Sequence, residues 1–342
     1  MLRYQKLFDP KVLRLKAPAL EKPRRAFVAD YEYDDSIVLA VNVALATGRP
    51  LLLRGDAGSG KSTLAEDVAR LLHWRYYEQV VSSTVEAADL LWRMDHVGRI
   101  ADAQAGNTSA RAQVGDYVEP GVLWWAFAPE QARKRGLAAE PRLPARDPEL
   151  RTWKLKSPST APAVVLLDEI DKAEPDFPND LLVPLGSLSF QVRTSDVDIV
   201  VQAPPEMRPL VIVTTNEERD LPSAFLRRCV VLRLTVPGRE PPGPERLKAI
   251  ARQHFPEEKL DAPVLEALME RYFEFRDSAA KLRVRPPGTA EFLDAARAVV
   301  ELWDKGAKET FTDFIKKNEW VFRELTQAAL WKHRQLPPDS KP

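Results

Sequence analysis

The chain has 342 residues, of which 44% are hydrophobic and 29% are charged, as in ordinary globular proteins. It is longer than a typical single domain, so we expect two domains with a sizeable core. Lys plus Arg and Asp plus Glu number 50 each, so composition gives no overall attraction to nucleic acid.

A single cysteine, Cys229, excludes an internal disulfide and favours a reducing compartment, so we expect a cytoplasmic protein. No apolar run approaches the roughly 18 residues that a membrane span requires. The N-terminus has scattered charges where an export signal has an apolar stretch. The four histidines lie far apart in the sequence, which argues against a histidine metal site.

Short apolar, β-branched segments predict five strands, at 50–55, 76–81, 163–168, 210–216 and 230–236. Helical patterns at 36–47 and 62–72 separate the first of them, which is typical of buried parallel strands. Two alternating segments within 190–202 predict a hairpin just before the fourth strand. We therefore expect an α/β nucleotide-binding core.

The composition changes between Arg99 and Ala161, where small polar residues give way to a Pro-, Arg- and Lys-rich stretch. A segment this long without clear periodicity is usually a functional insertion or a mobile loop. Within it, "YVEPGVLWWAF" contains Trp124 and Trp125, for which burial in the core is favoured over an exposed contact surface.

After "VPGREPPGPE" the chain becomes purely helical, and this Pro-Gly cluster predicts a domain boundary. Four helical patterns follow, and the second has apolar residues at helical spacing, namely Val264, Leu265, Leu268, Met269, Tyr272 and Phe273. We expect an N-terminal tail at 1–26, an α/β domain at 27–240 and a small helical domain at 244–336.

The segment "GDAGSGKS" satisfies the pattern G-x-x-x-x-G-K-[ST] between an apolar strand and a helix, which argues against a chance Gly-rich turn. Its glycines let backbone N–H groups face phosphates, Lys61 can neutralise β- and γ-phosphate charge, and Ser62 offers a hydroxyl to Mg²⁺. The residues expected to form this phosphate-binding site are Gly55, Asp56, Ala57, Gly58, Ser59, Gly60, Lys61, Ser62 and Thr63.

A second apolar strand ends in Asp168-Glu169, the form of a Walker B site. Asp168 can hold Mg²⁺ and Glu169 can deprotonate the attacking water, which favours hydrolysis over phosphoryl transfer to a metabolite. The fourth strand ends in "TTN", where Asn216 is either a ligand of the lytic water or a turn residue. Arg227 and Arg228 in "LPSAFLRRC" are either phosphate ligands or a surface pair.

These elements in this order resemble the AAA+ ATPases over nearly the whole chain, from about 31 to 335. The segments "GDAGSGKS", "VVLLDEIDKAEPDFPNDLL", "VIVTTNEERDLPSAFLRRC" and "RPPGTAEFLDAAR" resemble the MoxR branch in particular. The resemblance implies a five-stranded parallel sheet flanked by helices and a helical lid. It also implies ATP and Mg²⁺ bound at subunit boundaries and a homo-oligomeric ring, commonly a hexamer.

In that scheme Asn216 is sensor 1, and Arg227 or Arg228 reaches the ATP of the neighbouring subunit. The third lid helix has no arginine in its first turn, so Arg285 is the candidate for sensor 2, with Arg283 nearby. The MoxR branch also has an insertion in the second helix and a hairpin before sensor 1. The candidates are 95–116 for that insertion and 190–202 for the hairpin, and 130–162 is a further insertion.

The function implied by the resemblance is ATP-driven remodelling of protein partners by a chaperone, and a von Willebrand factor A domain protein is one implied partner. Two alternatives stay open. One is a DNA-associated motor of a restriction or defence system, and zero net charge without a basic-aromatic repeat argues against it. The other is a slow, ATP-gated scaffold or switch.

Overall fold

The computed structural model describes residues 6–16, 31–104, 114–141, 144–149, 161–195, 197–258, 260–302 and 319–333. Parts of the predicted tail, insertions, hairpin and helical domain lie outside the described residues, namely 1–5, 17–26, 105–113, 142–143, 150–160, Asp196, 259, 303–318 and 334–336. The chain divides into two compact units. One includes Tyr33–Arg54 and Ser62–Arg233, and the other includes Gly55–Lys61 and the chain from Leu234 on.

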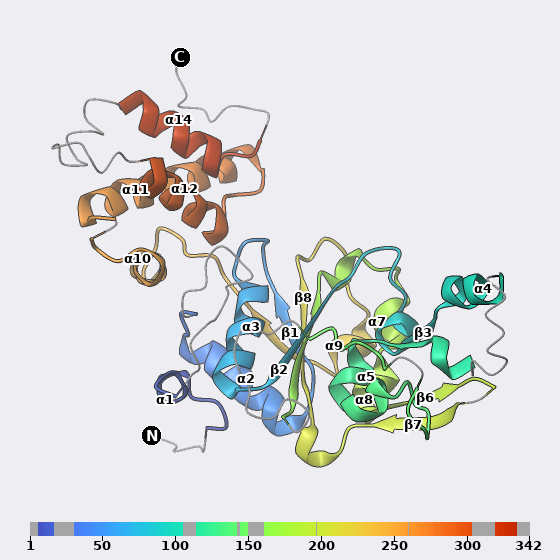
Figure 1. Cartoon of the computed structure of the whole chain (residues 1–342). Helices are drawn as coiled ribbons and strands as arrows, with labels where there is room; N and C mark the ends of the chain where they lie inside the picture. Colours follow the sequence, from blue (N-terminus) through green and yellow to red (C-terminus); the bar gives the residue numbers. More distant parts are fainter. Residues whose placement is uncertain are drawn as a thin grey trace. The chain divides into compact units, whose positions relative to one another are not determined.

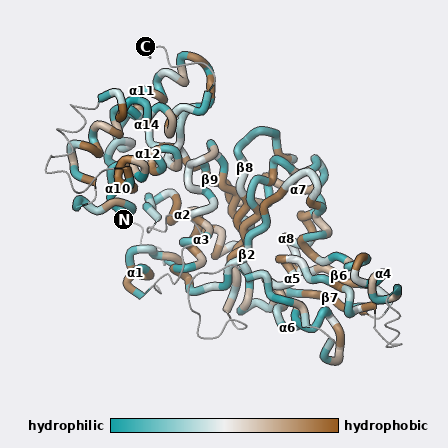
Figure 2. The backbone as a smooth tube through the Cα atoms, turned by 45° about the horizontal axis from the view of Figure 1, so that its top comes forward, coloured by the Kyte–Doolittle hydropathy of each residue, from teal (hydrophilic) through white to brown (hydrophobic). Residues whose placement is uncertain are grey.

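The first unit is built on a five-stranded sheet with the order β2-β5-β8-β1-β9, in which all neighbouring strands are parallel. The strands are β1 (Leu51–Arg54), β2 (Arg75–Val80), β5 (Ala163–Asp168), β8 (Leu210–Thr215) and β9 (Val230–Arg233). The three central strands are almost entirely buried and appear as hydrophobic stretches in Figure 2. This confirms the predicted fold class.

Helices cover both faces of this sheet (Figure 1). Helices α2 (Asp35–Thr47) and α3 (Lys61–Leu72) lie on one face, and α5 (Val122–Phe127), α7 (Phe177–Asp180) and α8 (Leu182–Ser187) lie on the other. Helix α2 begins where Asp34 accepts the backbone N–H of Ile37, and it ends at Gly48 in the left-handed conformation. Trp124 and Trp125 of α5 are 0% and 3% exposed, which confirms their predicted burial.

Two hairpins and a short helix lie on the side of this unit away from α2 (Figure 1). Strand β3 (Trp92–Met94) pairs antiparallel with β4 (Val118–Pro120), and β6 (Ser189–Arg193) pairs antiparallel with β7 (Asp198–Gln202). Helix α4 (His96–Gln104) follows β3 directly, and α6 (Pro129–Arg133) follows α5. The second hairpin leads into β8, one of the strands that carry the candidate site.

The segment before α2 contributes to the core of the first unit. The side chain of Phe8 is fully buried, and the backbone N–H groups of Leu7 and Phe8 donate to Asn42 Oδ1 at 2.6 and 2.9 Å. Helix α1 (Pro10–Arg14) comes next. Composition alone predicted only a tail here, because a single buried aromatic residue leaves no periodic pattern.

The second unit packs four described helices around a separate core, namely α10 (Gly243–His254), α11 (Ala262–Leu282), α12 (Thr289–Leu302) and α14 (Glu319–Leu330). The ring of Tyr272 on α11 packs edge-on against Phe292 on α12, with centroids 5.4 Å apart. All six apolar residues predicted to share a face of α11 are buried. Within the described ranges, no helix is both long and apolar enough to cross a membrane.

Candidate functional site

The phosphate-binding pattern forms a glycine-rich loop between β1 and α3. Gly55, Gly58 and Gly60 have φ angles of 135°, 80° and 90°, a region that other residues rarely adopt. A Cβ atom on Gly58 would lie 2.9 Å from Glu291 Oε2, so a side chain would not fit there without movement. The hydroxyl of Ser59 is buried without a hydrogen-bond partner among the described residues. These glycines let the loop adopt backbone conformations that residues with side chains rarely adopt.

Lys61 is the first residue of α3 and is 6% exposed. Its Nζ donates to the carbonyl oxygens of Gly55 and Asp56 at 2.6 and 2.9 Å. The loop therefore wraps around its own lysine. Of the other predicted loop residues, Asp56 is exposed, whereas Ala57 and Thr63 are half-buried.

Arg285, the candidate for sensor 2, precedes α12 in the second unit. Its guanidinium donates to the carbonyl oxygen of Ala57 at 3.1 Å and to Glu291 Oε1 at 2.9 Å. The other carboxylate oxygen of Glu291 accepts the backbone N–H of Gly288 at 3.0 Å. Arg285 thus contacts the phosphate-binding loop and is half-exposed, with 51% of its side chain accessible. Arg283 instead ends α11 in the left-handed conformation.

Three oxygen-bearing side chains meet where β5 and β8 end and α3 begins. Ser62 Oγ donates to Asp168 Oδ2 at 2.8 Å. Thr214, fully buried on β8, donates its hydroxyl proton to Asp168 Oδ1 and accepts the backbone N–H of Glu169. This cluster forms because parallel strands bring their carboxyl ends to one edge of the sheet. The carboxylate of Asp168 is therefore fixed by two hydroxyls.

Glu169 points to different partners from Asp168 because its backbone turns at the end of β5. It has a φ of 62° and a ψ of 48°, the left-handed conformation. Its Oε1 accepts from Asn216 Nδ2 at 3.3 Å, and its Oε2 accepts from Lys172 Nζ at 2.7 Å. That hydrogen bond and the negative charge of Glu169 raise the pKa of Lys172. Asn216 and Glu169 are therefore in hydrogen-bond contact.

Asp171 is a structural member of the site that the sequence analysis did not single out. Its Oδ2 accepts the backbone N–H groups of Asn216 and Glu218 at 3.2 and 3.0 Å. It is 4% exposed, and its Oδ1 is buried without a hydrogen-bond partner among the described residues. The available signal was a third acid in "DEID", but its role depends on the turn after β8, which the sequence does not place.

Arg227 and Arg228 do not join this cluster. They lie between α9 (Ser223–Leu226) and β9, at the amino ends of the strands, whereas Asp168 and Asn216 lie at or just beyond the carboxyl ends. Both arginines are exposed, and neither forms an ion pair with a described residue. Arg228 donates to the carbonyl oxygen of Ala224 at 3.2 Å.

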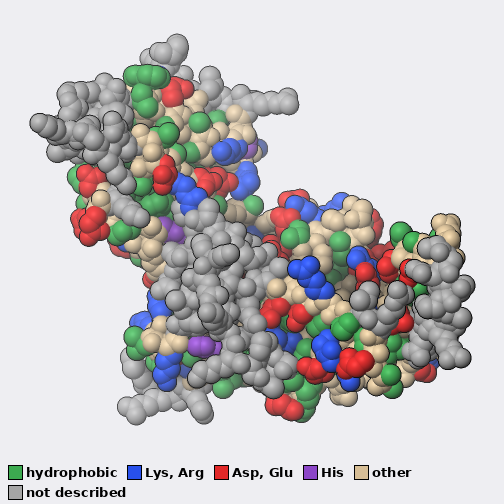
Figure 3. Space-filling model, viewed as in Figure 1, with side chains coloured by type: hydrophobic (Ala, Val, Ile, Leu, Met, Phe, Trp, Pro, Cys, Tyr) green, Lys and Arg blue, Asp and Glu red, His purple; other side chains and the backbone are tan. Residues whose placement is uncertain are grey.

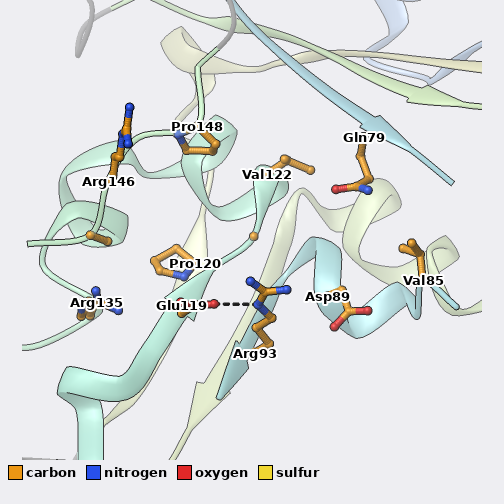
Figure 4. A pocket seen from close by; sticks show the side chains of 12 residues that line it. Gln79, Val85, Asp89, Arg93, Glu119, Pro120, Val122, Arg135, Arg146 and Pro148 are labelled. Atoms are coloured by element: carbon orange, nitrogen blue, oxygen red, sulfur yellow. Dashed lines mark hydrogen bonds and ion pairs between the residues drawn. The ribbon is translucent and has the colours of Figure 1, made fainter. Parts of the chain in front are cut away.

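A separate pocket of about 440 Å³ lies beside the carboxyl end of β2, at the base of the β3–β4 hairpin (Figure 4). Arg93 on β3 donates to Glu119 on β4 at 2.7 Å, and Arg135 donates to the carbonyl oxygen of Val118 at 2.6 Å. Asp89 and Gln79 also line the pocket. Both signs of charge are present, and two of its cations are bound by neighbouring groups.

The oxygen cluster has the chemistry that Mg²⁺ requires. A hydroxyl from Ser62 and a carboxylate from Asp168 are oxygen ligands, and Mg²⁺ usually takes one or two carboxylates together with substrate phosphates. No group of three or more His, Cys, Asp or Glu side chains within the described ranges could hold a metal alone. The site therefore fits a Mg²⁺ ion that arrives with a phosphate-bearing substrate.

Comparison with known proteins agrees with the loop and the sheet. A family model described as "AAA domain (dynein-related subfamily)" matches residues 50–229, more than half of the chain. Among solved structures, a point mutant of RuvB from Thermotoga maritima is similar at 15% identity and a TM-score of 0.35, over 86% of this chain and 80% of that chain. A likeness at this level adds nothing to the fold described above. No curated protein matches the chain.

Proposed function

This chain belongs to the dynein-related subfamily of AAA domains, and we propose that it hydrolyses ATP to ADP and phosphate. One observation carries the proposal: two adjacent acids at the end of β5 contact different partners. Asp168 is held by Ser62 and Thr214, whereas Glu169 contacts Asn216. Adjacent acids with separate partners can divide metal binding from proton transfer.

In the proposed reaction, each residue does what its contacts allow. Ser62 and Asp168 would hold Mg²⁺, which when bound neutralises charge on the phosphates. Lys61 would turn its three N–H donors from the loop carbonyls to the β- and γ-phosphate oxygens. Glu169 would accept a proton from the attacking water, while the amide of Asn216 would orient that water. Arg285 would contact the nucleotide as sensor 2.

We further propose that the chain is a MoxR-like ring protein that remodels protein partners, among which a von Willebrand factor A domain protein is one candidate. The quoted MoxR-like segments support this, as does the β6–β7 hairpin directly before β8. In the face shown in Figure 3, Lys and Arg are interspersed with Asp and Glu, which favours a protein partner over DNA. Arg227 or Arg228 would act on the ATP of a neighbouring copy.

A slow, ATP-gated switch is the second candidate, because Glu169 is ion-paired with Lys172 and must leave that pair to accept a proton. The two candidates share the chemistry and differ in rate.

The decisive experiment for hydrolysis is the Glu169→Gln variant. A general base contributes about 10²- to 10⁴-fold, so we expect ATP turnover to fall by at least ~10²-fold while nucleotide binding persists. Glu174→Gln, at an exposed acid five residues further along the chain, is the matched control and should turn over ATP normally. Unchanged hydrolysis in Glu169→Gln would refute the assignment.

A further inference from the structure

A second cavity of the first unit, of about 270 Å³, lies at the amino ends of the strands, opposite the edge that carries Asp168. Four of its lining residues lie one or two positions before the start of a strand. These are Pro50 before β1, Leu188 before β6, Arg208 before β8 and Cys229 before β9. The cavity is thus part of the sheet scaffold and separate from the ATP site.

The charged lining of this cavity is entirely positive. Arg49, Arg208 and Arg228 line it, and no acidic residue does. All three are exposed, and none forms an ion pair with any residue in the described part of the chain. The pocket in Figure 4 differs, because its Arg93 is paired with Glu119. Three unneutralised guanidinium groups around one cavity favour an anionic ligand.

One of the three arginines also has a structural explanation. A Cβ atom at Gly48 would lie 2.6 Å from Arg208 Nη1, so this guanidinium rests against the glycine that ends α2. A cation at a helix C-terminus is stabilising, and α2 has no basic residue in its last turn. This accounts for Arg208, and Arg228 donates to the carbonyl oxygen of Ala224 on α9.

The remaining lining is apolar. Leu181, Leu185 and Phe225 are 0%, 4% and 1% exposed and belong to the core of the unit. Cys229 also lines the cavity, and burial raises the pKa of its thiol to about 12, so it is neutral there. An apolar floor under a cationic rim suits a ligand with an aliphatic part and negative charges beside it.

Next to the cavity, helix α2 exposes further apolar side chains. Leu39 and Val43 are 50% and 38% exposed, and with Thr47 at the cavity they recur every four residues on one helix face. A bound chain could therefore extend from the cavity over exposed apolar side chains. At about 270 Å³ the cavity is below the ~300–1,000 Å³ typical of sites for drug-sized ligands, which argues for a side chain over a whole nucleotide.

We propose that this cavity binds a peptide segment of a partner protein in which an aliphatic side chain is flanked by carboxylates. The aliphatic group contacts the leucine and phenylalanine floor, and the carboxylates pair with Arg49 and Arg208. Binding at this end of the sheet needs no nucleotide, so it stands or falls independently of ATP hydrolysis.

The test is fluorescence anisotropy of a labelled peptide with two leucines between aspartate pairs, added to the full chain without nucleotide. We expect saturable binding that weakens with added salt. The Arg49→Gln, Arg208→Gln double variant should bind at least ~10-fold more weakly, because charge-assisted pairs are lost. Arg99→Gln, which removes an exposed arginine of α4 instead, should bind normally.

Gly186 offers a matched pair of variants for the cavity itself. It lines the cavity, and an added Cβ atom would meet no other atom within 4 Å. Gly186→Phe should block binding, whereas Gly186→Ala should keep it. Equal binding by a peptide with serines in place of the leucines would overturn the proposal. Displacement of the peptide by ATP or inorganic phosphate would also overturn it.

Discussion

At the scale of single residues, Glu169 has an uncommon, left-handed backbone conformation. A left-handed conformation is rare for a residue with a side chain and persists only when its surroundings hold it. Here the hydroxyl of Thr214 accepts the backbone N–H of Glu169, and Lys172 and Asn216 hold its carboxylate. Glu169 and Asp168 thus have separate partners, so that in the proposed reaction one acid would bind metal and the next would accept a proton.

Removal of Lys172 should free the Glu169 carboxylate to accept a proton from the attacking water. The two side chains are 42% and 31% exposed, and exposed ion pairs contribute at most ~1 kcal/mol, which corresponds to about a fivefold change in rate. We therefore expect Lys172→Ala to raise steady-state ATP turnover by up to about fivefold. Lys172→Arg keeps the pair and should turn over ATP at the original rate. A large loss of turnover in Lys172→Ala would instead mean that the lysine assists the reaction.

At the scale of elements, a buried arginine joins β2 to α5. Arg75 is 1% exposed and donates to the carbonyl oxygens of Trp125 and Ala126, at the end of α5, at 2.7 and 3.1 Å. It also donates to Ala161 O at 2.8 Å and to Tyr77 Oη at 3.0 Å. The arginine thus satisfies helix-end carbonyls that have no partner within the helix.

Replacement of Arg75 should destabilise the first unit strongly. Arg75→Met fills a similar volume but leaves these carbonyl oxygens buried without donors, and disruption of such a buried network costs about 3–5 kcal/mol. Urea unfolding should show this loss of free energy, and Arg75→Lys should recover part of it. Arg99→Met, at an exposed position, should remain within ~0.5 kcal/mol of the original chain. An equal effect of both methionine variants would contradict the role of Arg75.

Arg75 also illustrates the limit of sequence-based prediction for this chain. The five strands were predictable because each is a local apolar run, and the contacting residues Ser62, Asp168, Glu169 and Asn216 were predictable because they follow motifs at strand ends. Arg75 and Asp171 act through backbone groups that lie about 50 residues away in sequence, and no local pattern records such contacts. The resemblance to the AAA+ family implies roles for the motif residues, but it does not identify the backbone groups that Arg75 and Asp171 contact.

In the second unit, His254 on α10 should make the free energy of unfolding depend on pH. Burial lowers the pKa of His254 from 6.5 to about 4, and the positive charge of Arg297 acts in the same direction. Between these values the unfolded chain binds more protons than the folded one, so stability falls as pH decreases from about 6.5 to about 4. Above about 6.5 the histidine is neutral in both states and has no such effect.

The measurement is urea unfolding of the second unit within the full chain at pH 7 and pH 5, followed by hydrogen exchange of the backbone amides of α10 and α11. His254→Gln should lose less unfolding free energy between the two pH values than the original chain does. His96→Gln, which changes an exposed histidine of α4, should show the original loss. If the two variants behave alike, His254 is not the group responsible.

At the scale of the whole molecule, the position of Arg227 and Arg228 requires a second copy if either acts on ATP. They lie at the amino ends of strands whose opposite ends carry Asp168 and lead to Asn216, so they cannot reach a phosphate held by Asp168 of the same chain. Assembly of AAA domains into rings would bring one copy's arginines to the next copy's ATP. The double variant Arg227→Ala, Arg228→Ala and the variant Glu169→Gln should therefore each lose turnover alone.

Mixing these two variants should restore activity. In a mixed ring, a copy with intact Glu169 can hold ATP beside a copy with intact arginines, and random mixing gives about a quarter of such interfaces. Mixing Glu169→Gln with Lys61→Ala is the control and should restore nothing, because both changes damage the ATP-holding side of an interface. Absence of recovery in the first mixture, together with a monomeric native mass in the presence of ATP, would exclude the ring mechanism. Recovery only in the first mixture would assign the arginines to the neighbouring copy.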